Sequence, residues 1–476
     1  MRPLLVLFLL ANPWLLHAQT DPPPVLTRRA MLQLVSENHP VARQAGLRPD
    51  MGDAMVRSAR GAFDPVIKAG YDEKTFENKE YFSLLDAGLV VPTWFGVELY
   101  GGFQNNSGTF LDPQANTPDD GLLKAGISVS LGQGLFIDKR RAELRKSLAY
   151  RDMAEAERTD LLNDMFHDAL DDHLKWVAAY KQLQVNSEAL DAAMQRFEAV
   201  KGSFRGGDRP AIDTLEAWLQ VQDRMLRLSQ TRVDLRNAAL QLSNHLWDPA
   251  MRPLELSPEV VPDTLDLLPP GPAPLLDTLV AQAMELHPDL RNIAAKLEQL
   301  DVERQYRGEL LKPELDVRYM FLGNGSAITT EQGTTLNEND RQLGFGFRMP
   351  LALRTERGQL SLAKLRLRDT ELELERKRLN VRNSIGQRNN DLALYAEQVD
   401  LGAEMVRNYR RLLQGENVRF ASGESSLFLV NQREVALLDS RISQVTREAR
   451  LCKSHYTLER DAGVLWSNVL RTMEQP

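Results

Sequence analysis

The amino-acid sequence repeats its own layout. A His-Pro pair at 39–40 recurs at 287–288, a spacing of 248 positions, and Tyr71 recurs as Tyr319 at that spacing. Three further matches share a spacing of 216 positions: Leu135 with Leu351, Phe204 with Phe420, and Gly207 with Gly423. Self-similarity on this scale predicts two matched units, each with a helix, a strand region, a long helix, a turn and a helix. Because the spacings differ by 32 positions, the first unit carries an insertion between Tyr71 and Leu135.

The first 18 residues have the features of a secretory signal peptide. Arg2 precedes an apolar run over 4–10, and Leu16-His17-Ala18 offers a plausible cleavage site. The alternative is an uncleaved anchor, but Asn12-Pro13 interrupts the run, which is short for a bilayer span. We therefore expect export and cleavage near Ala18.

The remaining composition excludes several kinds of protein. No later stretch approaches about 18 consecutive apolar residues, so we expect no transmembrane helix in the mature chain. Cys452 is the single cysteine, which rules out an internal disulfide, and its position near the C-terminus rules out a lipid anchor. A formal net charge of −8 argues against nucleic acid or anionic lipid headgroups as partners.

Two long helical hairpins are expected. The segment 135–200 contains no Gly and no Pro, which predicts one continuous helix about 100 Å long at about 1.5 Å per residue. A second helix is expected to open at Pro210, and each helix carries apolar residues at seven-residue spacing. The rows are Leu162, Ala169, Trp176, Leu183, Leu190 and Phe197, beside Phe166, His173, Tyr180, Ser187 and Met194, and then Ile212, Leu219, Leu226, Val233, Leu240 and Trp247. These rows predict an antiparallel coiled coil.

The second unit repeats this scheme from Leu351, with breaks expected at Gly415 and over 421–424. Eight prolines within 248–274 predict a linker that runs extended over the surface. The expected organisation is a signal peptide over 1–18, a first unit over 19–247, the linker over 248–274, and a second unit over 275–476.

The strand regions alternate between apolar and polar residues. In the second unit the apolar positions are Leu315, Val317, Tyr319 and Phe321, and then Leu343, Phe345 and Phe347. In an exported protein this period of two is typical of membrane barrel strands, which are apolar toward lipid and polar toward the lumen. Since two strands cannot close a barrel and lipid tolerates no open sheet edge, other strands and other copies would have to complete it.

Together these features resemble the TolC-like outer-membrane efflux protein family over about 27–470. The most specific local pattern is an aromatic residue, Gly three positions later, and a polar residue that opens the next helix. It occurs twice, as Phe204, Gly207, Asp208 and as Phe420, Gly423, Glu424. The resemblance implies a mainly α fold with a homotrimeric twelve-stranded outer-membrane barrel and a periplasmic twelve-helix tube. It also implies that the hairpin tips dock on a periplasmic adaptor (membrane fusion protein) that joins the duct to an inner-membrane pump.

In that family, side chains nine and twelve positions after the tip aromatic residue ring the closed periplasmic end. The corresponding residues are Leu429 and Gln432 in the second unit and Asp213 and Glu216 in the first. The family's acidic pair belongs to the second unit, so the sequence departs from it here. Three Leu429 side chains could form a hydrophobic constriction, or Leu429 could pack within its helix pair. Asp213 and Glu216 follow Pro210, where the helix dipole alone favours carboxylates, so a cation-attracting ring and a dipole effect both remain open.

No constellation of residues indicates an enzyme. His167 and Asp171 are spaced to share a metal, but His173 falls in the coiled-coil row, so we expect no metal site and no cofactor. The His-Pro pairs lack a nucleophile and are explained by helix boundaries before proline.

The sequence therefore predicts a passive outer-membrane exit duct for efflux or type I secretion, which opens at its periplasmic tip on contact with adaptor and pump. The alternative is an elongated periplasmic coiled-coil scaffold or adhesion protein. The insertion contains two further expected strands, over 81–91 and 94–104, and a polar loop. It could be a plug, a surface feature, or extra barrel strands that raise the total above twelve.

Overall fold

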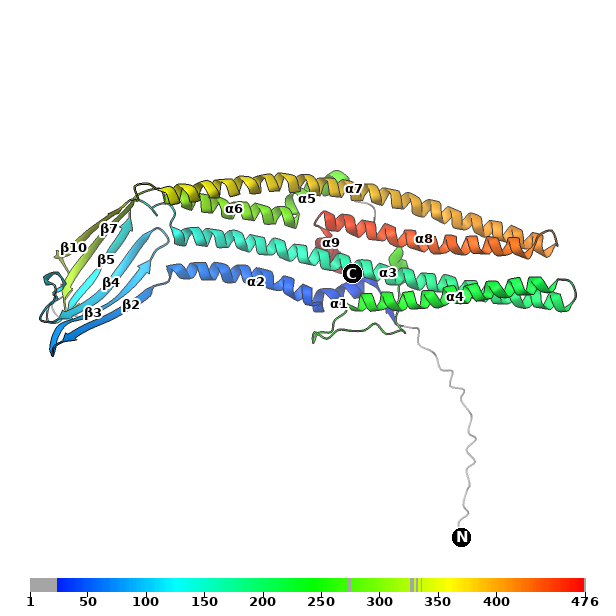
Figure 1. The fold of residues 1–476 in the computed structure, drawn as a ribbon, viewed down its shortest axis with the longest axis horizontal. Helices are drawn as coiled ribbons and strands as arrows, with labels where there is room; N and C mark the ends of the chain where they lie inside the picture. Colours follow the sequence, from blue (N-terminus) through cyan, green and yellow to red (C-terminus); the bar gives the residue numbers. More distant parts are fainter. Residues whose placement is uncertain are drawn as a thin grey trace, which may run out of the picture.

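Two helices of nearly seventy residues run from a β-sheet at one end of the molecule to helical turns at the other (Figure 1). They are α3 (Lys139–Arg205) and α7 (Arg354–Ala421). The structure is a computed structural model that describes residues 24–269, 271, 275–325, 329–330, 333–334 and 336–474. The expected signal peptide lies outside the described residues.

The two expected units have a similar order of elements. The first unit contains α1 (Arg28–Asn38), α2 (Pro40–Arg60), a strand region, α3 and α4 (Ala211–Ser243). The second unit contains α5 (Leu276–Leu286), α6 (Pro288–Glu309), a strand region, α7, α8 (Leu427–Asp461) and a short closing helix, α9 (Leu465–Glu474).

The His-Pro pairs are helix boundaries, as expected. His39 ends α1 and begins α2, and its Nδ1 accepts a hydrogen bond from the Val41 N–H at 3.2 Å. His287 does the same between α5 and α6, accepting from the Asp289 N–H at 3.2 Å. The repeat therefore preserves a cap together with a sequence pattern.

The helices form one curved layer, four across. Near the sheet the contacts run in the order α2, α3, α6, α7, and toward the far end in the order α4, α3, α8, α7 (Figure 1). Among the helices that the structure describes, none is long and apolar enough to cross a membrane.

The largest core lies midway along the molecule. Phe166 and Trp176 of α3 are buried there against Val35 of α1, Leu242 of α4 and Leu465 of α9. A second core joins α5, α7 and α8 around the fully buried Ile385. These cores tie the second unit's last helices to the first unit, so the two repeats form a single body.

The proline-rich linker is more than a surface connection. Its β6 (Val261–Pro262) pairs with β1 (Val25–Leu26), and a 3-10 turn, η3 (Thr264–Leu267), inserts Leu267 into the main core. The expectation of an extended surface path is therefore wrong for this part. The prolines exclude α-helix but do not prevent a short turn from packing inward.

The predicted heptad rows are correct for α3 near the middle and wrong for α4. Leu162, Ala169 and Trp176 are buried, but the α4 row faces away from α3. Its exposed fractions are Ile212 64%, Leu219 54%, Leu226 73%, Val233 52% and Leu240 46%. Helix α4 instead packs through Ala217, Val221, Leu228 and Leu242, so its large apolar residues have no partner in a single chain.

Two predicted breaks also differ. Helix α7 continues through Gly415 and ends at Ala421, because glycine costs only about 1 kcal/mol in a helix that packs along its length. Asp208 and Glu424 lie within the turns and do not open helices, since α4 begins at Ala211 and α8 at Leu427.

The strand regions of both units form one antiparallel sheet of six strands, in the order β10-β7-β5-β4-β3-β2. The first unit supplies four of them, and the second unit supplies two. Their bounds are β2 (Val66–Phe76), β3 (Lys79–Pro92), β4 (Val97–Ser107), β5 (Leu122–Ser130), β7 (Glu314–Asn324) and β10 (Leu336–Arg348). A small hairpin, β8 (Thr329–Thr330) with β9 (Gly333–Thr334), lies between β7 and β10.

The insertion thus adds strands to the sheet. Its predicted strands correspond to β3 and β4, and the polar loop after β4 contains the short turn η2 (Pro113–Ala115). Of the three readings of the insertion, extra sheet strands is the one that this arrangement matches.

Candidate functional site

One face of the six-stranded sheet is apolar from edge to edge. The register aligns Ile67, Leu89, Gly101, Ala125 and Phe321 in a single row across five strands. The next rows add Ala69 and Tyr71 of β2; Leu85, Ala87 and Val91 of β3; Val97, Leu99 and Phe103 of β4; Leu123, Ile127 and Val129 of β5; Leu315, Val317 and Tyr319 of β7; and Leu343, Phe345 and Phe347 of β10.

At the edges of the sheet these side chains have little to pack against within the chain, whereas Leu123 of β5 is only 9% exposed. Ile67 is 80% exposed at one edge of the sheet, and Phe345 is 70% exposed at the other. The same face ends in polar residues at the rim far from the helices, with Glu73, Asn105 and Arg341. An apolar band with a polar rim matches the outer surface of a membrane barrel.

The opposite face is mostly polar or glycine. One row across it contains Gly344, Arg318, Ser128 and Glu98. Other polar members are Lys68, Asp72, Asp86, Gln104, Lys124, Ser130, Asp316 and Gln342. Such a face suits contact with water.

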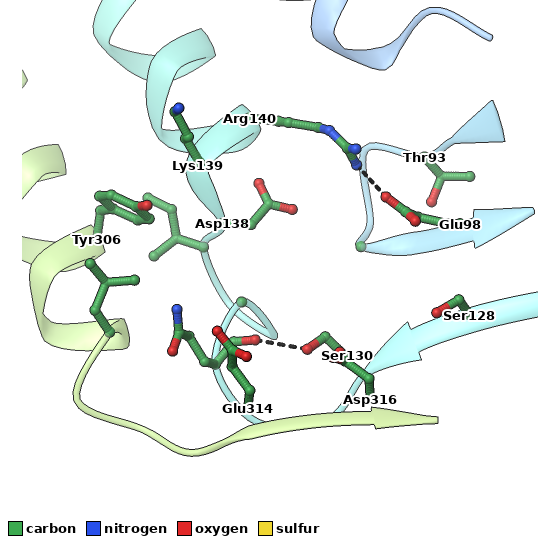
Figure 2. A pocket seen from close by; sticks show the side chains of 15 residues that line it. Thr93, Glu98, Ser128, Ser130, Asp138, Lys139, Arg140, Tyr306, Glu314 and Asp316 are labelled. Atoms are coloured by element: carbon green, nitrogen blue, oxygen red, sulfur yellow. Dashed lines mark hydrogen bonds and ion pairs between the residues drawn. The ribbon is translucent and has the colours of Figure 1, made fainter. Parts of the chain in front are cut away.

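A cavity of about 580 Å³ lies where this polar face meets the helices (Figure 2). Arg140, in the first turn of α3, donates to Glu98 of β4 at 2.7 Å across it. Glu314 and Asp316 of β7 line the same cavity, and Ser130 Oγ donates to the Gln133 carbonyl at 2.9 Å. The Arg140–Glu98 ion pair joins the first turn of α3 to the sheet.

At the far end of the molecule, both hairpin turns use the same backbone arrangement. Gly207 has φ +81° and Gly423 has φ +79°, the left-handed region that favours glycine. The Asp208 N–H donates to Ser203 O at 3.0 Å, and the Glu424 N–H donates to Arg419 O at 2.8 Å. These are Schellman caps, in which a residue with positive φ, most often glycine, ends the helix. A Cβ added at either glycine would meet nothing within 4 Å.

The two hairpins touch one another at these turns. The Arg209 guanidinium carbon lies 4.0 Å from the centroid of the Phe420 ring. Asn431 Nδ2 donates to Glu216 Oε1 at 2.9 Å. Leu427 of α8 is buried against Val200 and Ala217 of the other hairpin. The tip is therefore joined by one apolar cluster and two polar contacts.

The tip aromatic residues are not equivalent. Phe204 is 43% exposed, whereas Phe420 is half-buried beneath Arg209. Among the gate candidates, Leu429 is half-buried and Gln432 is exposed. Asp213 pairs with Arg209 at 3.2 Å, so both first-unit carboxylates have a partner on the described chain.

Ion pairs continue between the hairpins above the tip. Arg227 Nη1 donates to Asp439 Oδ1 at 2.7 Å, and Arg441 Nη2 donates to Glu188 Oε2 at 2.7 Å. Arg196 pairs with Glu434. These residues do not stand out in the sequence, because each partner lies on the other hairpin.

The residues considered as metal ligands, His167, Asp171 and His173, do not converge on one site. His173 Nε2 bonds to Asp266 Oδ2 at 2.9 Å, and Asp266 also accepts from the Arg28 N–H at 2.7 Å. Asp171 instead pairs with Lys175 at 3.0 Å and with Lys453 at 2.8 Å. Within the described residues, no group of His, Cys, Asp or Glu is arranged to hold a metal ion.

Burial perturbs some titratable groups in the middle of the molecule. His39 stacks on His245 with ring centroids 5.8 Å apart. Burial, and to a lesser extent the charge of His245, lowers the pKa of His39 to about 4. Burial raises the pKa of the Cys452 thiol to about 12, so this cysteine stays unreactive.

The chain has the fold of solved outer-membrane channels. The outer membrane channel CmeC of Campylobacter jejuni is 14% identical, with 93% of this chain and 88% of CmeC covered and a TM-score of 0.62. The outer membrane channel MtrE of Neisseria gonorrhoeae, solved in its open state, is 14% identical, with coverages of 92% and 89% and a TM-score of 0.63. VceC, an outer membrane protein of Vibrio cholerae, is 12% identical, with coverages of 91% and 95% and a TM-score of 0.62. The expected TolC-like architecture is thus confirmed as a fold.

Sequence comparison adds no closer assignment. No protein-family model matches the chain, and no curated protein matches it.

Proposed function

We propose that three copies of this chain form a passive exit duct through the outer membrane, with the helical layers closing into a tube in the periplasm. The observation that carries the proposal is the apolar sheet face, which leaves Leu343, Phe345 and Phe347 63–70% exposed in a single chain. In water a face of this kind would promote aggregation, whereas in a bilayer it contacts lipid. The fold shared with outer-membrane channels supports the same conclusion.

The outward apolar rows support a ring of copies. Helix α4 lies at one side of the helical layer and α7 at the other. Both carry exposed apolar residues at heptad spacing, and in the part of α7 level with α4 these include Leu394 48% and Leu401 58%. Packing α4 of one copy against α7 of the next buries both rows and is a head-to-tail contact, the kind that closes a ring.

The tip is proposed as the gate and the docking site. Its contacts hold the two hairpins of one chain together, and Leu429 of the three copies forms the apolar constriction. Asp213 and Glu216, with Gln432, lie near the entrance. The turns around Phe204, Gly207 and Asp208 and around Phe420, Gly423 and Glu424 dock the periplasmic adaptor, which links the duct to an inner-membrane pump for efflux or type I secretion.

Fractionation and conductance test the duct against the scaffold alternative. The duct should sediment with the outer membrane, require detergent for extraction, appear as three chains by native mass spectrometry, and conduct ions in a planar bilayer. Release with soluble periplasmic proteins and absence of conductance would support the scaffold and refute the duct.

A further inference from the structure

We infer that all six strands of each chain belong to the barrel wall, so that three copies close an eighteen-stranded barrel in which β2 of one copy pairs with β10 of the next. This inference rests on the proposed function and concerns the size of its membrane channel. The twelve strands implied by the family resemblance require four per chain, whereas the sheet contains six.

The inserted strands continue the wall without interruption. β3 pairs with β4 over ten consecutive Cα partners, from Ser83 with Ser107 to Pro92 with Glu98, with no register shift. The apolar face continues through both strands: Ile67 and Leu89 align with Gly101 of β4, and Ala69 and Ala87 align with Phe103. A plug or a surface lobe does not face lipid, so its apolar residues would not need to continue the register of the wall.

The two sheet edges match each other. In the described residues β2 pairs only with β3, and β10 pairs only with β7. Because successive strands alternate in direction, β2 and β10 run antiparallel when two copies stand side by side. An even number of antiparallel strands can then close without leaving unpaired N–H and C=O groups in lipid, where each would cost several kcal/mol.

Side-chain parity restricts this seam. Ile67, Ala69 and Tyr71 lie on the apolar face of β2, and the odd-numbered residues 343–347 lie on the apolar face of β10. Only registers that place odd residues opposite odd residues keep the apolar face continuous around the barrel.

The β2–β10 seam lies on the same side of the chain as the proposed contact between α4 and α7 of neighbouring copies. β2 follows α2, which contacts α3 on the same side as α4, and β10 leads directly into α7 (Figure 1). The contact of α4 with α7 between copies and the contact of β2 with β10 therefore belong to one continuous interface.

The competing arrangement is a twelve-stranded barrel built from β4, β5, β7 and β10. There β4 would meet β10 of the next copy, and the β2–β3 hairpin would have to leave the sheet. This would break the hydrogen bonds between β3 and β4 and leave that edge of β3 unpaired. Since barrel diameter grows roughly linearly with strand number, the eighteen-stranded barrel should be about one and a half times as wide as the twelve-stranded one.

Cysteine cross-linking in full-length protein in outer membranes distinguishes the two barrels. In a Cys452→Ala background, Ala69→Cys is combined in turn with Leu343→Cys, Phe345→Cys and Phe347→Cys and treated with a short bis-maleimide. We expect bands of two and three chains for at least one of these pairs. Ala69→Cys with Gly344→Cys or Gly346→Cys places the thiols on opposite faces and should give a monomer band. Ala69→Cys with Ala87→Cys, which are Cα partners within one chain, is the positive control for reactivity.

The outcomes separate this inference from the proposed function. If an inserted, conducting trimer gives no cross-link between β2 and β10, or if Leu99→Cys cross-links to β10 of a neighbouring copy, the eighteen-stranded barrel is wrong while the duct stands. A cross-linked complex of only two chains by native mass spectrometry would also overturn it, because two copies supply twelve strands. If the protein is soluble and forms no oligomer, the proposed function itself fails.

Discussion

Arg209 and Phe420 join the two helical hairpins at their tips, with the guanidinium carbon 4.0 Å from the ring centroid. The residues belong to different repeats, so this contact links the two repeats within one chain. Arg209 also pairs with Asp213 at 3.2 Å, which holds its side chain over the ring.

Arg209→Ala should favour the open tip. A cation–π contact at an exposed site contributes about 0.5–1 kcal/mol, so the open population should rise about two- to fivefold for each copy. Single-channel recording in planar bilayers measures this change as more frequent or larger openings. The matched control is Arg205→Ala, an exposed arginine of the same turn, which should leave the channel closed. Equal conductance of the Arg209→Ala and Arg205→Ala channels would show that Arg209 does not hold the tip closed.

Leu429→Asp should open the constriction. The change removes an apolar contact and brings three carboxylates together, each pair repelling by about 1 kcal/mol at 4 Å in water. We expect higher conductance and entry of large antibiotics such as vancomycin into cells. The neighbouring Phe428 is 56% exposed, and Phe428→Asp serves as the control. A less stable trimer with unchanged conductance would show that Leu429 only packs between helices.

Gly207→Val or Gly423→Val should impair adaptor docking without impairing insertion. A left-handed backbone costs an L-residue about 1–2 kcal/mol, so the turn must distort even though space is available. Adaptor cross-linking should fall, and outer-membrane fractionation should be unchanged. Gly202→Val is the control, because Gly202 lies within the last turns of α3 and has open space around it. Undiminished cross-linking in the turn variants would argue against these glycines as docking determinants.

Protonation of His39 should lower the stability of the folded chain at acid pH. Its pKa is lowered to about 4 in the folded chain, mainly by burial and next by His245. Between about pH 6.5 and pH 4 the unfolded chain therefore binds more protons, so stability is lost as the pH falls through this interval. For this half-buried group we expect a loss on the order of 1 kcal/mol.

His39→Asn tests that expectation, because asparagine can still cap α2 but does not titrate. The fall in apparent melting temperature between pH 7 and pH 4.5, followed by circular dichroism, should be smaller in the variant than in the original protein. An identical fall in both would assign the acid sensitivity to other groups.

Several elements were predictable because their causes are local. The absence of Gly and Pro over 135–200 predicted α3, and the alternation around Tyr319 and Phe345 predicted β7 and β10. Gly207 and Gly423 were identified as turn glycines because a helix end in the left-handed region strongly favours that residue.

Other features depend on neighbours that are distant in the sequence. The seven-residue row of α4 was correctly detected, but periodicity cannot say which partner covers it, and Leu226 proved to face outward. Asp266 bonds to His173, 93 positions away, so no local pattern could mark it. The sequence also contained the strands of the insertion, yet only the tertiary register placed Ile67 and Leu89 on the same face as Phe321. The sequence by itself thus determined the elements and their duplication, because these follow from short-range sterics and periodicity. The tertiary structure decided which faces meet and how many strands share one sheet, because those depend on long-range packing.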